Sequence, residues 1–276
     1  MQHFNWVKSI TTLIMLAVGI VFLLPFLWML SASMKMEADV FNYPIEWIPT
    51  QWNAWNNYKE VWTGEYPFMT YYLNSIKVSV LTTVTSVLVS CMAAYGFAKV
   101  KFKGRDVIFM IVLVTYMIPH PTIIVPQFLV YRYLGLFDTH VGLILLGSFS
   151  VLGTFMLRQF FMGIHNEFIE SAKIDGAGHT RTFFSIALPL VRPAIATYAI
   201  LRFIWTWNDY QNPLVFLRSD HLFTIQLGIR KFASESGDFY SLIMAGSVSA
   251  IIVLVVIFIL GQKHVIEGIS LGGVKG

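Results

Sequence analysis

Six stretches of this chain are long and almost wholly apolar, and they constrain its fold more than any other feature. In chain order they cover residues 10–30, 74–98, 107–131, 141–161, from 194 to a few residues past 207, and 242–261. A helix that crosses the hydrocarbon core of a bilayer needs roughly 20 such residues. Only 12% of the residues are charged, whereas soluble domains carry about 25%. The sequence therefore predicts an all-α integral membrane protein with six transmembrane helices.

Prolines interrupt the third apolar stretch. Pro119, Pro121 and Pro126 all lie in its second half. Because proline lacks a backbone donor and collides with the preceding helical turn, we expect this helix to be kinked or broken there. Lipid tolerates a break only where protein or a water-filled cavity satisfies the freed backbone groups. His120 lies between two of the prolines, and we interpret it as a polar group that lines the break.

The charges of the loops indicate which way the helices cross the membrane. Residues 99–106 hold four basic side chains and one acidic one, whereas residues 31–72 hold two basic and five acidic ones. Short basic loops stay in the cytoplasm. We therefore expect a multi-pass protein of the cytoplasmic membrane with both termini inside. The connection between the fourth and fifth spans is then also inside.

The predicted outer segment is rich in tryptophan. It contains Trp47, Trp52 and Trp55. Tryptophan is enriched at the headgroup level of membranes, so the segment is interpreted as an amphipathic surface element. The alternative is that it docks an extracellular partner, and the sequence leaves both open.

Ionisable side chains are scarce inside the predicted spans. Asp106 and Asp209 are the carboxylates nearest to a span, and each lies at an edge. Carboxylates at membrane depth usually mark ion relays, so their scarcity argues against an ion-coupled carrier. The chain has no phosphate-binding loop of the G-x-x-x-x-G-K-[ST] type and a single cysteine, Cys91. We expect no catalytic residues, no metal and no bound cofactor. Basic residues lie beside the spans rather than on one face, so no nucleic-acid partner is expected.

Arg202 is the exception, a charged residue roughly 12 Å into the fifth span. It should face the bundle interior or a cavity, where it either pairs with a backbone carbonyl or partner subunit, or contacts a substrate. Aromatic and amide side chains follow it. They suit a sugar, whose hydroxyls need hydrogen-bond partners, but they also fit an interfacial belt. The candidate substrate path comprises Arg202, Trp205, Trp207, Asn208 and Tyr210.

A polar stretch separates the fourth and fifth spans. Asn166 is a suitable N-cap for a short helix there. Gly176 and Gly178 would end that helix after about ten residues. A second short helix is expected after the glycines, and Pro189 would mark where the chain turns back into the bilayer.

Two elements of this stretch have a fixed spacing. Glu170-Ser171-Ala172 is followed after three residues by Gly176, and after nine more by Ile186-Ala187-Leu188-Pro189. This resembles the EAA loop of ABC importer permeases, E-A-A-x3-G-x9-I-x-L-P, with Ser171 as a small-for-small departure. The segments KFKGR, MLRQFFMGIHNEFIESAKIDGAG and VIEGISLGGVKG also resemble the maltose-type carbohydrate permeases. The likeness covers nearly the whole chain and is better to the second of that family's two paired permeases.

The resemblance implies a type I ABC importer permease fold, with a core at residues 70–262 of a single membrane domain, 1–276. It implies a heterodimer with a homologous permease, two cytoplasmic ATPase subunits that bind ATP and Mg, and an extracytoplasmic solute-binding protein that delivers the sugar. The loop at residues 165–193 would be the coupling helix that docks on the ATPases. Its expected contact residues are Glu170, Ser171, Ala172, Asp175, Gly176, Ile186, Leu188 and Pro189.

The resulting hypothesis is a non-catalytic permease subunit that moves a sugar or oligosaccharide across the cytoplasmic membrane, in contact with lipid. One alternative is an importer for another polar solute, such as glycerol phosphate or a polyol. A different class of alternative is a self-sufficient membrane carrier or enzyme. Gradient-driven uptake or turnover by the chain alone would favour that second alternative.

Overall fold

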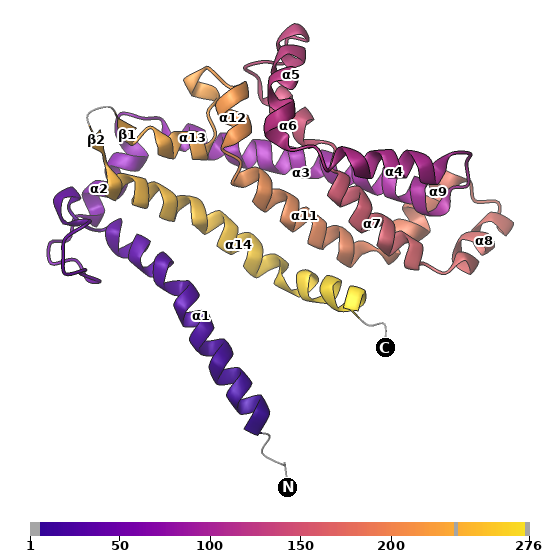
Figure 1. Cartoon of the computed structure of the whole chain (residues 1–276), viewed down its shortest axis with the longest axis horizontal. Coiled ribbons are helices and arrows are strands. Elements are labelled where there is room, and N and C mark those ends of the chain that lie inside the picture. The colour runs from indigo at the N-terminus through magenta and orange to yellow at the C-terminus, as the bar shows by residue number, and fades with distance from the viewer. Residues whose placement is uncertain (1–5, 235–236, 274–276) are drawn as a thin grey trace. The chain divides into compact units, whose positions relative to one another are not determined.

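A computed structural model describes residues 6–234 and 237–273, in which nearly all regular structure is helical (Figure 1). The chain forms two compact units. Unit 1 comprises the residues up to Met69 together with Gly228–Ile252, and unit 2 comprises Thr70–Leu227 together with the residues from Val253 onward. The described strands form one antiparallel pair, β1 (Ala233–Ser234) and β2 (Gly237–Asp238). The predicted all-α fold is confirmed.

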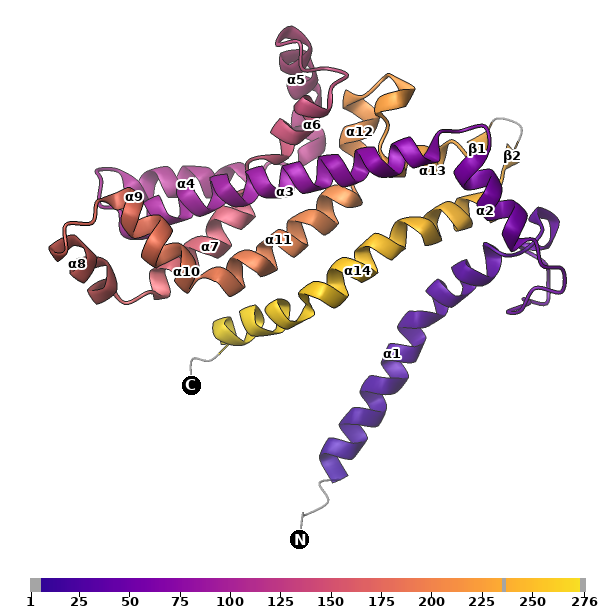
Figure 2. The ribbon, with the colours of Figure 1, turned by 180° about the vertical axis from the view of Figure 1, so that it is seen from behind.

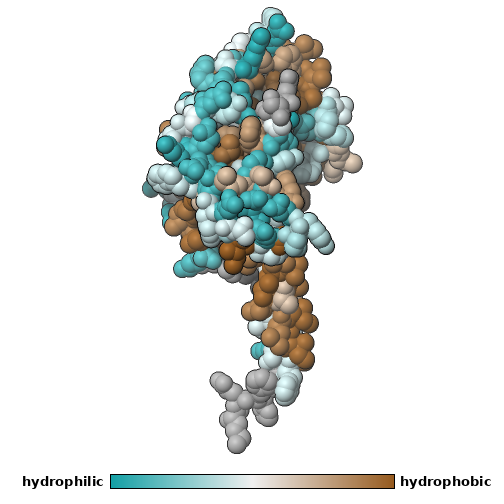
Figure 3. Space-filling model, turned by 90° about the vertical axis from the view of Figure 1, so that its left-hand side faces the viewer, coloured by the Kyte–Doolittle hydropathy of each residue, from teal (hydrophilic) through white to brown (hydrophobic). Residues whose placement is uncertain are grey.

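Unit 1 begins with α1 (Trp6–Ala32), a 27-residue helix. Its side chains are exposed along almost its whole length. In Figure 3, α1 occupies the lower part of the view and its surface is largely brown, that is, hydrophobic. An exposed apolar surface of this length matches the hydrocarbon core of a bilayer rather than water. The structure thus agrees with a membrane-spanning first helix.

The segment after α1 folds back on itself around α2 (Ala54–Thr63). The side-chain amide of Asn57 donates to the carbonyl oxygens of Ser33 and Lys35, at 3.0 and 2.8 Å. Lys35 is buried, and its ammonium group donates to the carbonyl oxygen of Glu46 at 2.6 Å. The three tryptophans of this segment remain exposed: Trp47, Trp52 and Trp55. They are therefore available to lipid headgroups or to a partner, as predicted.

A short 3₁₀ turn, η1 (Glu37–Asp39), fixes the start of α14 (Tyr240–Gly273). The carboxylate of Glu37 accepts hydrogen bonds from the backbone N–H groups of Tyr240 and Ser241, both at 2.9 Å. The first N–H groups of a helix have no partner within the helix. Glu37 supplies that partner and adds a negative charge at the positive end of the helix dipole.

Unit 2 contains most of the helices. They are α3 (Phe68–Lys99, which starts in unit 1), α4 (Arg105–Thr115), α5 (His120–Tyr133), α6 (His140–Gly147), α7 (Val151–Gly163), α8 (Asn166–Ile174), α9 (His179–Thr182), a π-helical turn (Phe183–Ala187), α10 (Leu188–Leu190), α11 (Arg192–Trp207), α12 (Gln211–Phe216), a 3₁₀ turn η3 (Asp220–Leu222) and α13 (Ile225–Arg230, which ends in unit 1). Figures 1 and 2 show α7 and α11 lying beside α3. In both views α8 lies near the end of α3, whereas α12 lies toward its start.

The six predicted spans correspond to three long helices and three bent pairs within the described residues. The long helices are α1, α3 and α14. The pairs bend by 99° between α4 and α5, by 43° between α6 and α7, and by 80° between the α9–α10 segment and α11. The expected break in the third span is confirmed, and the chain turns into α11 just after Pro189, as predicted.

The fourth span departs from the prediction, which treated residues 141–161 as one helix. It is interrupted between Gly147 and Val151. Ser150 adopts an extended backbone there, and its hydroxyl accepts the N–H of Gly153 at 3.0 Å, which starts α7. A serine can cap a new helix in this way even inside an apolar stretch. Hydrophobicity alone did not reveal the break.

Tyr198 of α11 joins the central helices of unit 2. Its hydroxyl lies 2.7 Å from the hydroxyl of Ser86 and accepts a longer bond, 3.4 Å, from Ser90, both on α3. A Cβ atom on Gly153 of α7 would overlap the ring and hydroxyl of Tyr198. The absence of a side chain at this position therefore allows α7 to approach α11 closely.

We predict that Gly153→Ala destabilises the protein by about 1–3 kcal/mol, because the added methyl group displaces Tyr198 from a fully packed core. Thermal unfolding of the purified protein measures the effect. Gly163→Ala is the matched control, since Gly163 ends the same helix and its Cβ would meet no atom within 4 Å. Equal melting temperatures for the two variants would contradict this packing role of Gly153.

Candidate functional site

The first part of the predicted coupling loop, residues 165–193, forms α8, a nine-residue helix. The rest forms α9, the π-helical turn, α10 and the start of α11. Ile169 and Ala172 are buried, at 4% and 5% exposure, and Ile169 packs in the same core cluster as Phe183. The outer face of α8 is partly apolar, because Phe168 and Ile174 are 51% and 86% exposed. Large apolar side chains that are exposed on a polar surface often mark a binding site. This face suits a protein partner.

The structure distributes the predicted coupling residues between two environments. Glu170, Ser171, Asp175 and Gly176 are exposed, whereas Ala172 is buried and Ile186, Leu188 and Pro189 are partly buried. The exposed residues lie on the surface that a partner can reach. The buried and partly buried residues instead support that surface from within unit 2. Direct contact between any of these eight residues and an ATPase stays a prediction.

Gly176 ends the helix in the left-handed conformation, with φ of 77°. Its N–H donates to the carbonyl of Lys173 at 3.0 Å, and the N–H of Ala177 donates to the carbonyl of Ala172 at 2.8 Å. This pairing satisfies carbonyls at the end of the helix, and glycine is the residue that adopts the required φ without strain. The expectation that glycine stops this helix is confirmed.

Lys99, the last residue of α3, anchors the start of α8. Its ammonium group donates to the carbonyl of Ile164 at 2.6 Å and to the side-chain oxygen of Asn166 at 2.9 Å. The sequence predicts Asn166 as the N-cap, but Asn166 is the first helical residue, and His165 takes the cap position without a side-chain hydrogen bond. The Asn166 oxygen is therefore used for a tertiary contact instead. Two charge-assisted bonds tie α8 to a long span.

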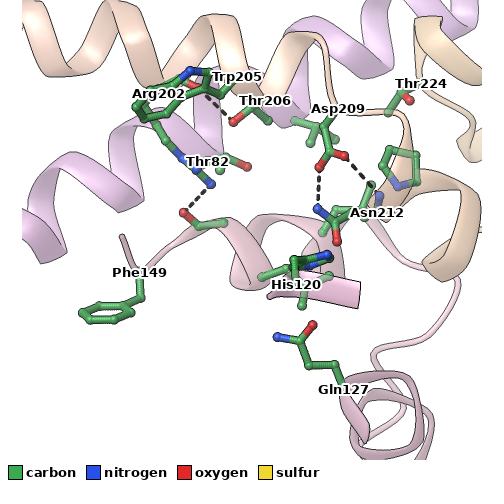
Figure 4. A pocket seen from close by; sticks show the side chains of 15 residues that line it. Thr82, His120, Gln127, Phe149, Arg202, Trp205, Thr206, Asp209, Asn212 and Thr224 are labelled. Carbon is green, nitrogen blue, oxygen red and sulfur yellow. Dashed lines mark hydrogen bonds between the residues drawn. The ribbon is translucent and has the colours of Figure 1, made fainter. Parts of the chain in front are cut away.

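A pocket of about 310 Å³ lies elsewhere in unit 2 (Figure 4). Its lining side chains come from α3, α5, α6, α11 and α12 and the segments that follow them. The labelled ones are Thr82, His120, Gln127, Phe149, Arg202, Trp205, Thr206, Asp209, Asn212 and Thr224. The breaks at Pro119 and after Gly147 both border it. A cavity of this kind is where lipid-embedded proteins tolerate interrupted helices.

Arg202 enters this pocket from α11. One of its terminal nitrogens donates to the carbonyl oxygen of Gly147 at 2.7 Å, at the end of α6. The last carbonyls of a helix have no partner within the helix, and this one receives a guanidinium. The predicted pairing of Arg202 with a backbone carbonyl is therefore found, and the same side chain also lines the cavity.

The other four residues of the predicted substrate path lie in different environments. Trp205 lines the pocket. Trp207 is 1% exposed and packs with Phe203 and Tyr72, at ring distances of 5.8 and 5.6 Å, so it belongs to the core. Asn208 and Tyr210 are exposed and do not line this pocket. The structure brings together two of the five predicted residues.

Four of the polar pocket side chains that the sequence analysis missed share one property. They are Thr82, Gln127, Asn212 and Thr224. Each has a buried oxygen that makes no hydrogen bond to the part of the chain that is described. The available signal was an uncharged polar residue inside or beside an apolar span, as for Thr82 and Gln127. That signal is weak, because threonine and glutamine can bond within their own helix.

Asp138 connects the start of α6 to the end of α12, two helices that form the pocket. Its carboxylate accepts the backbone N–H groups of Arg218 and Ser219 at 2.8 and 2.9 Å and the hydroxyl of Ser219. Its own N–H donates to the carbonyl of Phe216 at 2.9 Å. Burial raises the pKa of this carboxyl, but the hydrogen bonds from Ser219 and Arg218 outweigh it, and the pKa is lowered. Asp138 therefore stays ionised and keeps these bonds at neutral pH.

Comparison with known proteins gives a consistent result. Residues 86–265 match the family described as "Binding-protein-dependent transport system inner membrane component". The arabinooligosaccharides transport system permease protein AraQ of Bacillus subtilis (strain 168) is 32% identical over 275 residues, covering 99% of this chain and 98% of that protein. The sn-glycerol-3-phosphate transport system permease protein UgpE of Yersinia pestis bv. Antiqua (strain Antiqua) is 32% identical over 264 residues, covering 93% and 94%.

A solved structure agrees with these sequence relatives. A chain in the crystal structure of a bacterial ABC transporter involved in the import of the acidic polysaccharide alginate superposes with a TM-score of 0.80. The two chains are 25% identical, and the match covers 95% of this chain and 99% of the other. The fold is that of a type I ABC importer permease. This chain belongs to the family of binding-protein-dependent transport system inner membrane components.

We predict that Lys99→Met loosens α8, because it removes both bonds that Lys99 donates to the residues at its start. A loss of about 1 kcal/mol corresponds to roughly fivefold faster amide exchange. Hydrogen–deuterium exchange of residues 164–176 in the membrane-embedded protein measures it. Lys103→Met, an exposed lysine in the following loop, is the control. Unchanged exchange in Lys99→Met would contradict the anchoring role.

Proposed function

We propose that this chain is one of two permease subunits of an ATP-driven importer that moves a sugar or oligosaccharide across the cytoplasmic membrane. The observation that carries the proposal is its likeness, over 99% of its length, to the permease AraQ of an arabinooligosaccharides transport system. A relative matched from end to end shares the spans, the loops and the connections between them. Similarity confined to one span would be weaker support.

The proposed assembly contains a homologous second permease, two cytoplasmic ATPase subunits and an extracytoplasmic solute-binding protein. ATP and Mg are bound by the ATPase subunits, and this chain binds no cofactor of its own. The sequence supports this division of labour, because it has no phosphate-binding loop and no carboxylates placed as an ion relay within the spans. Energy must then come from another chain.

The proposed point of entry for that energy is α8. Its outer face offers exposed apolar side chains, Phe168 and Ile174, next to the exposed Glu170. Closure of the ATPases on ATP would displace α8, and Lys99 would transmit the displacement to α3 through its bonds at 2.6 and 2.9 Å. A helix tied to a span by short bonds moves with it rather than sliding past it.

The proposed orientation puts both termini and α8 in the cytoplasm. The basic loop at residues 99–106 follows directly on α3, and α8 lies near that same end of α3 (Figure 2). Basic loops are retained on the cytoplasmic side, which is where ATPase subunits meet their ATP. The charges of the loop and the proposed coupling role therefore both require α8 to lie on the cytoplasmic side of the membrane.

A second candidate substrate is a phosphorylated polyol. It is favoured by the likeness to the sn-glycerol-3-phosphate permease UgpE, which covers 93% of this chain. The spans, coupling helix and partners would be the same for either substrate. Competition between the two solutes for uptake by the assembled transporter separates the candidates.

We predict that Gly176→Leu lowers coupled uptake roughly 5- to 30-fold without removing the permease from the membrane. Leucine at φ of 77° costs about 1–2 kcal/mol and reshapes the end of α8. It causes no clash within the chain, because a Cβ there meets no atom within 4 Å. The measurement is ATP-driven uptake by the assembled transporter, with membrane abundance and ATPase co-purification followed in parallel.

Gly176→Asn is the matched control, because asparagine tolerates the left-handed conformation. It should retain most of the uptake. Wild-type uptake and full ATPase retention in Gly176→Leu would refute the coupling assignment. Loss of that variant from the membrane would instead assign Gly176 a role in folding.

A further inference from the structure

The pocket of Figure 4 contains polar atoms that have no partner in the described chain. Five buried atoms share this property: Thr82 Oγ1, Gln127 Oε1, Arg202 Nε, Asn212 Oδ1 and Thr224 Oγ1. Burial of an unpaired polar atom is unfavourable, and native proteins rarely keep several together. All five side chains line one cavity, although each of these atoms is itself covered by neighbouring atoms. Small side-chain rotations would turn the atoms toward a hydrogen-bonding molecule held in the cavity.

The five atoms also define what that molecule must offer. The amide oxygens of Gln127 and Asn212 accept hydrogen bonds, the guanidinium nitrogen of Arg202 donates one, and the two threonine hydroxyls do either. A molecule with several hydroxyl groups, each able to donate and accept, matches this set. An ionised phosphate or carboxylate group only accepts, so it cannot itself satisfy the two amide oxygens, and hydroxyl groups elsewhere on the molecule must do so.

The charges in the pocket favour a neutral molecule as well. Among the lining residues, Arg202 is basic and Asp209 is acidic, apart from His120, and their opposite charges balance. Asp209 is already engaged, since its two oxygens accept the backbone N–H and the side-chain amide of Asn212 at 3.1 and 2.6 Å. Bringing a dianionic phosphate near this carboxylate would be repulsive in a low-dielectric site.

The volume of the pocket and the tryptophan in its wall indicate what kind of molecule fits it. A volume of about 310 Å³ is at the small end of the range for small-molecule sites, roughly 300–1,000 Å³. The indole of Trp205, 42% exposed, forms part of the lining. An aromatic face packs well against the C–H face of a sugar ring, while the ring hydroxyls turn to the polar wall.

We propose that this pocket binds one neutral sugar ring of the transported solute, so that this subunit itself contributes a substrate site. The assignment rests on the proposed importer function and deepens it, because it selects a neutral sugar over a phosphorylated polyol. Arg202 serves two purposes in this site. It satisfies the end of α6 through Gly147 and presents its Nε to a sugar hydroxyl.

Thr82 and Thr83 provide a matched pair of variants. Each has a buried hydroxyl without a partner in the described chain, but only Thr82 lines the pocket. Thr82→Val and Thr83→Val therefore make the same isosteric change at neighbouring positions of α3, and neither breaks a side-chain hydrogen bond. Gln127→Leu is a second pocket variant, on a different helix, that decides the matter should Thr82→Val fail to assemble.

The experiment measures the affinity of radiolabelled arabinotriose and galactobiose for the transporter purified with its permease and ATPase partners, without the solute-binding protein. We expect one of these neutral sugars to bind, and sn-glycerol 3-phosphate not to displace it. Thr82→Val and Gln127→Leu should each raise Kd about 2- to 10-fold, the range for one lost hydrogen bond. Thr83→Val should leave Kd unchanged.

The proposal is overturned if neither sugar binds, if the pocket variants and Thr83→Val have the same Kd, or if glycerol phosphate displaces the sugar. It is also overturned if the pocket variants change only assembly with the second permease, since partner side chains would then fill the cavity. ATP-driven uptake in the presence of the solute-binding protein tests the importer function separately. Uptake without sugar binding to the complex removes this site and leaves that function standing.

Discussion

A bilayer offers no hydrogen bonds to a polypeptide, and each interrupted helix in this chain must find its partners inside the protein. The structure meets this constraint with side chains from other helices. Arg202 donates to the carbonyl of Gly147 where α6 ends, and the hydroxyl of Ser150 accepts the N–H of Gly153 where α7 begins. The same constraint explains why polar side chains gather where the spans bend. A cavity with polar walls forms there.

The two candidate sites of unit 2 contain different parts of α3, one near its middle and the other at its last residue. Thr82 of the pocket and Lys99 of the α8 anchor are both on this helix, 17 positions apart in the sequence. At 1.5 Å per residue this is roughly 25 Å along a straight helix. A displacement of α8 can affect the pocket if a rigid element connects the two, and we infer that the long helix α3 is this element. The two hydrogen bonds from Lys99 are the direct contacts through which a movement of α8 can be passed to α3.

Local patterns in the sequence were sufficient for some features and insufficient for others. The spans, the break near Pro119 and the helix stop at Gly176 follow from length, proline and glycine, whose effects act over a few residues. The burial of Ala172 and Trp207 does not, because it depends on which face of a helix meets a neighbour. The pocket is the extreme case. Thr82 and Thr224 are 142 positions apart, and only the packing of several helices brings both residues to one cavity.

Chemical cross-linking from α8 tests most directly the central claim, that α8 transmits force from an ATPase to the spans. Ile174 is 86% exposed, and Cys91 is the only native cysteine. An Ile174→Cys change in a Cys91→Ser background therefore gives a unique, accessible thiol. In the assembled transporter, a short thiol–amine cross-linker should join this thiol to an ATPase subunit, with a yield that changes between ATP-bound and nucleotide-free states. A yield that is absent, or the same in both states, while uptake remains active, would contradict the account.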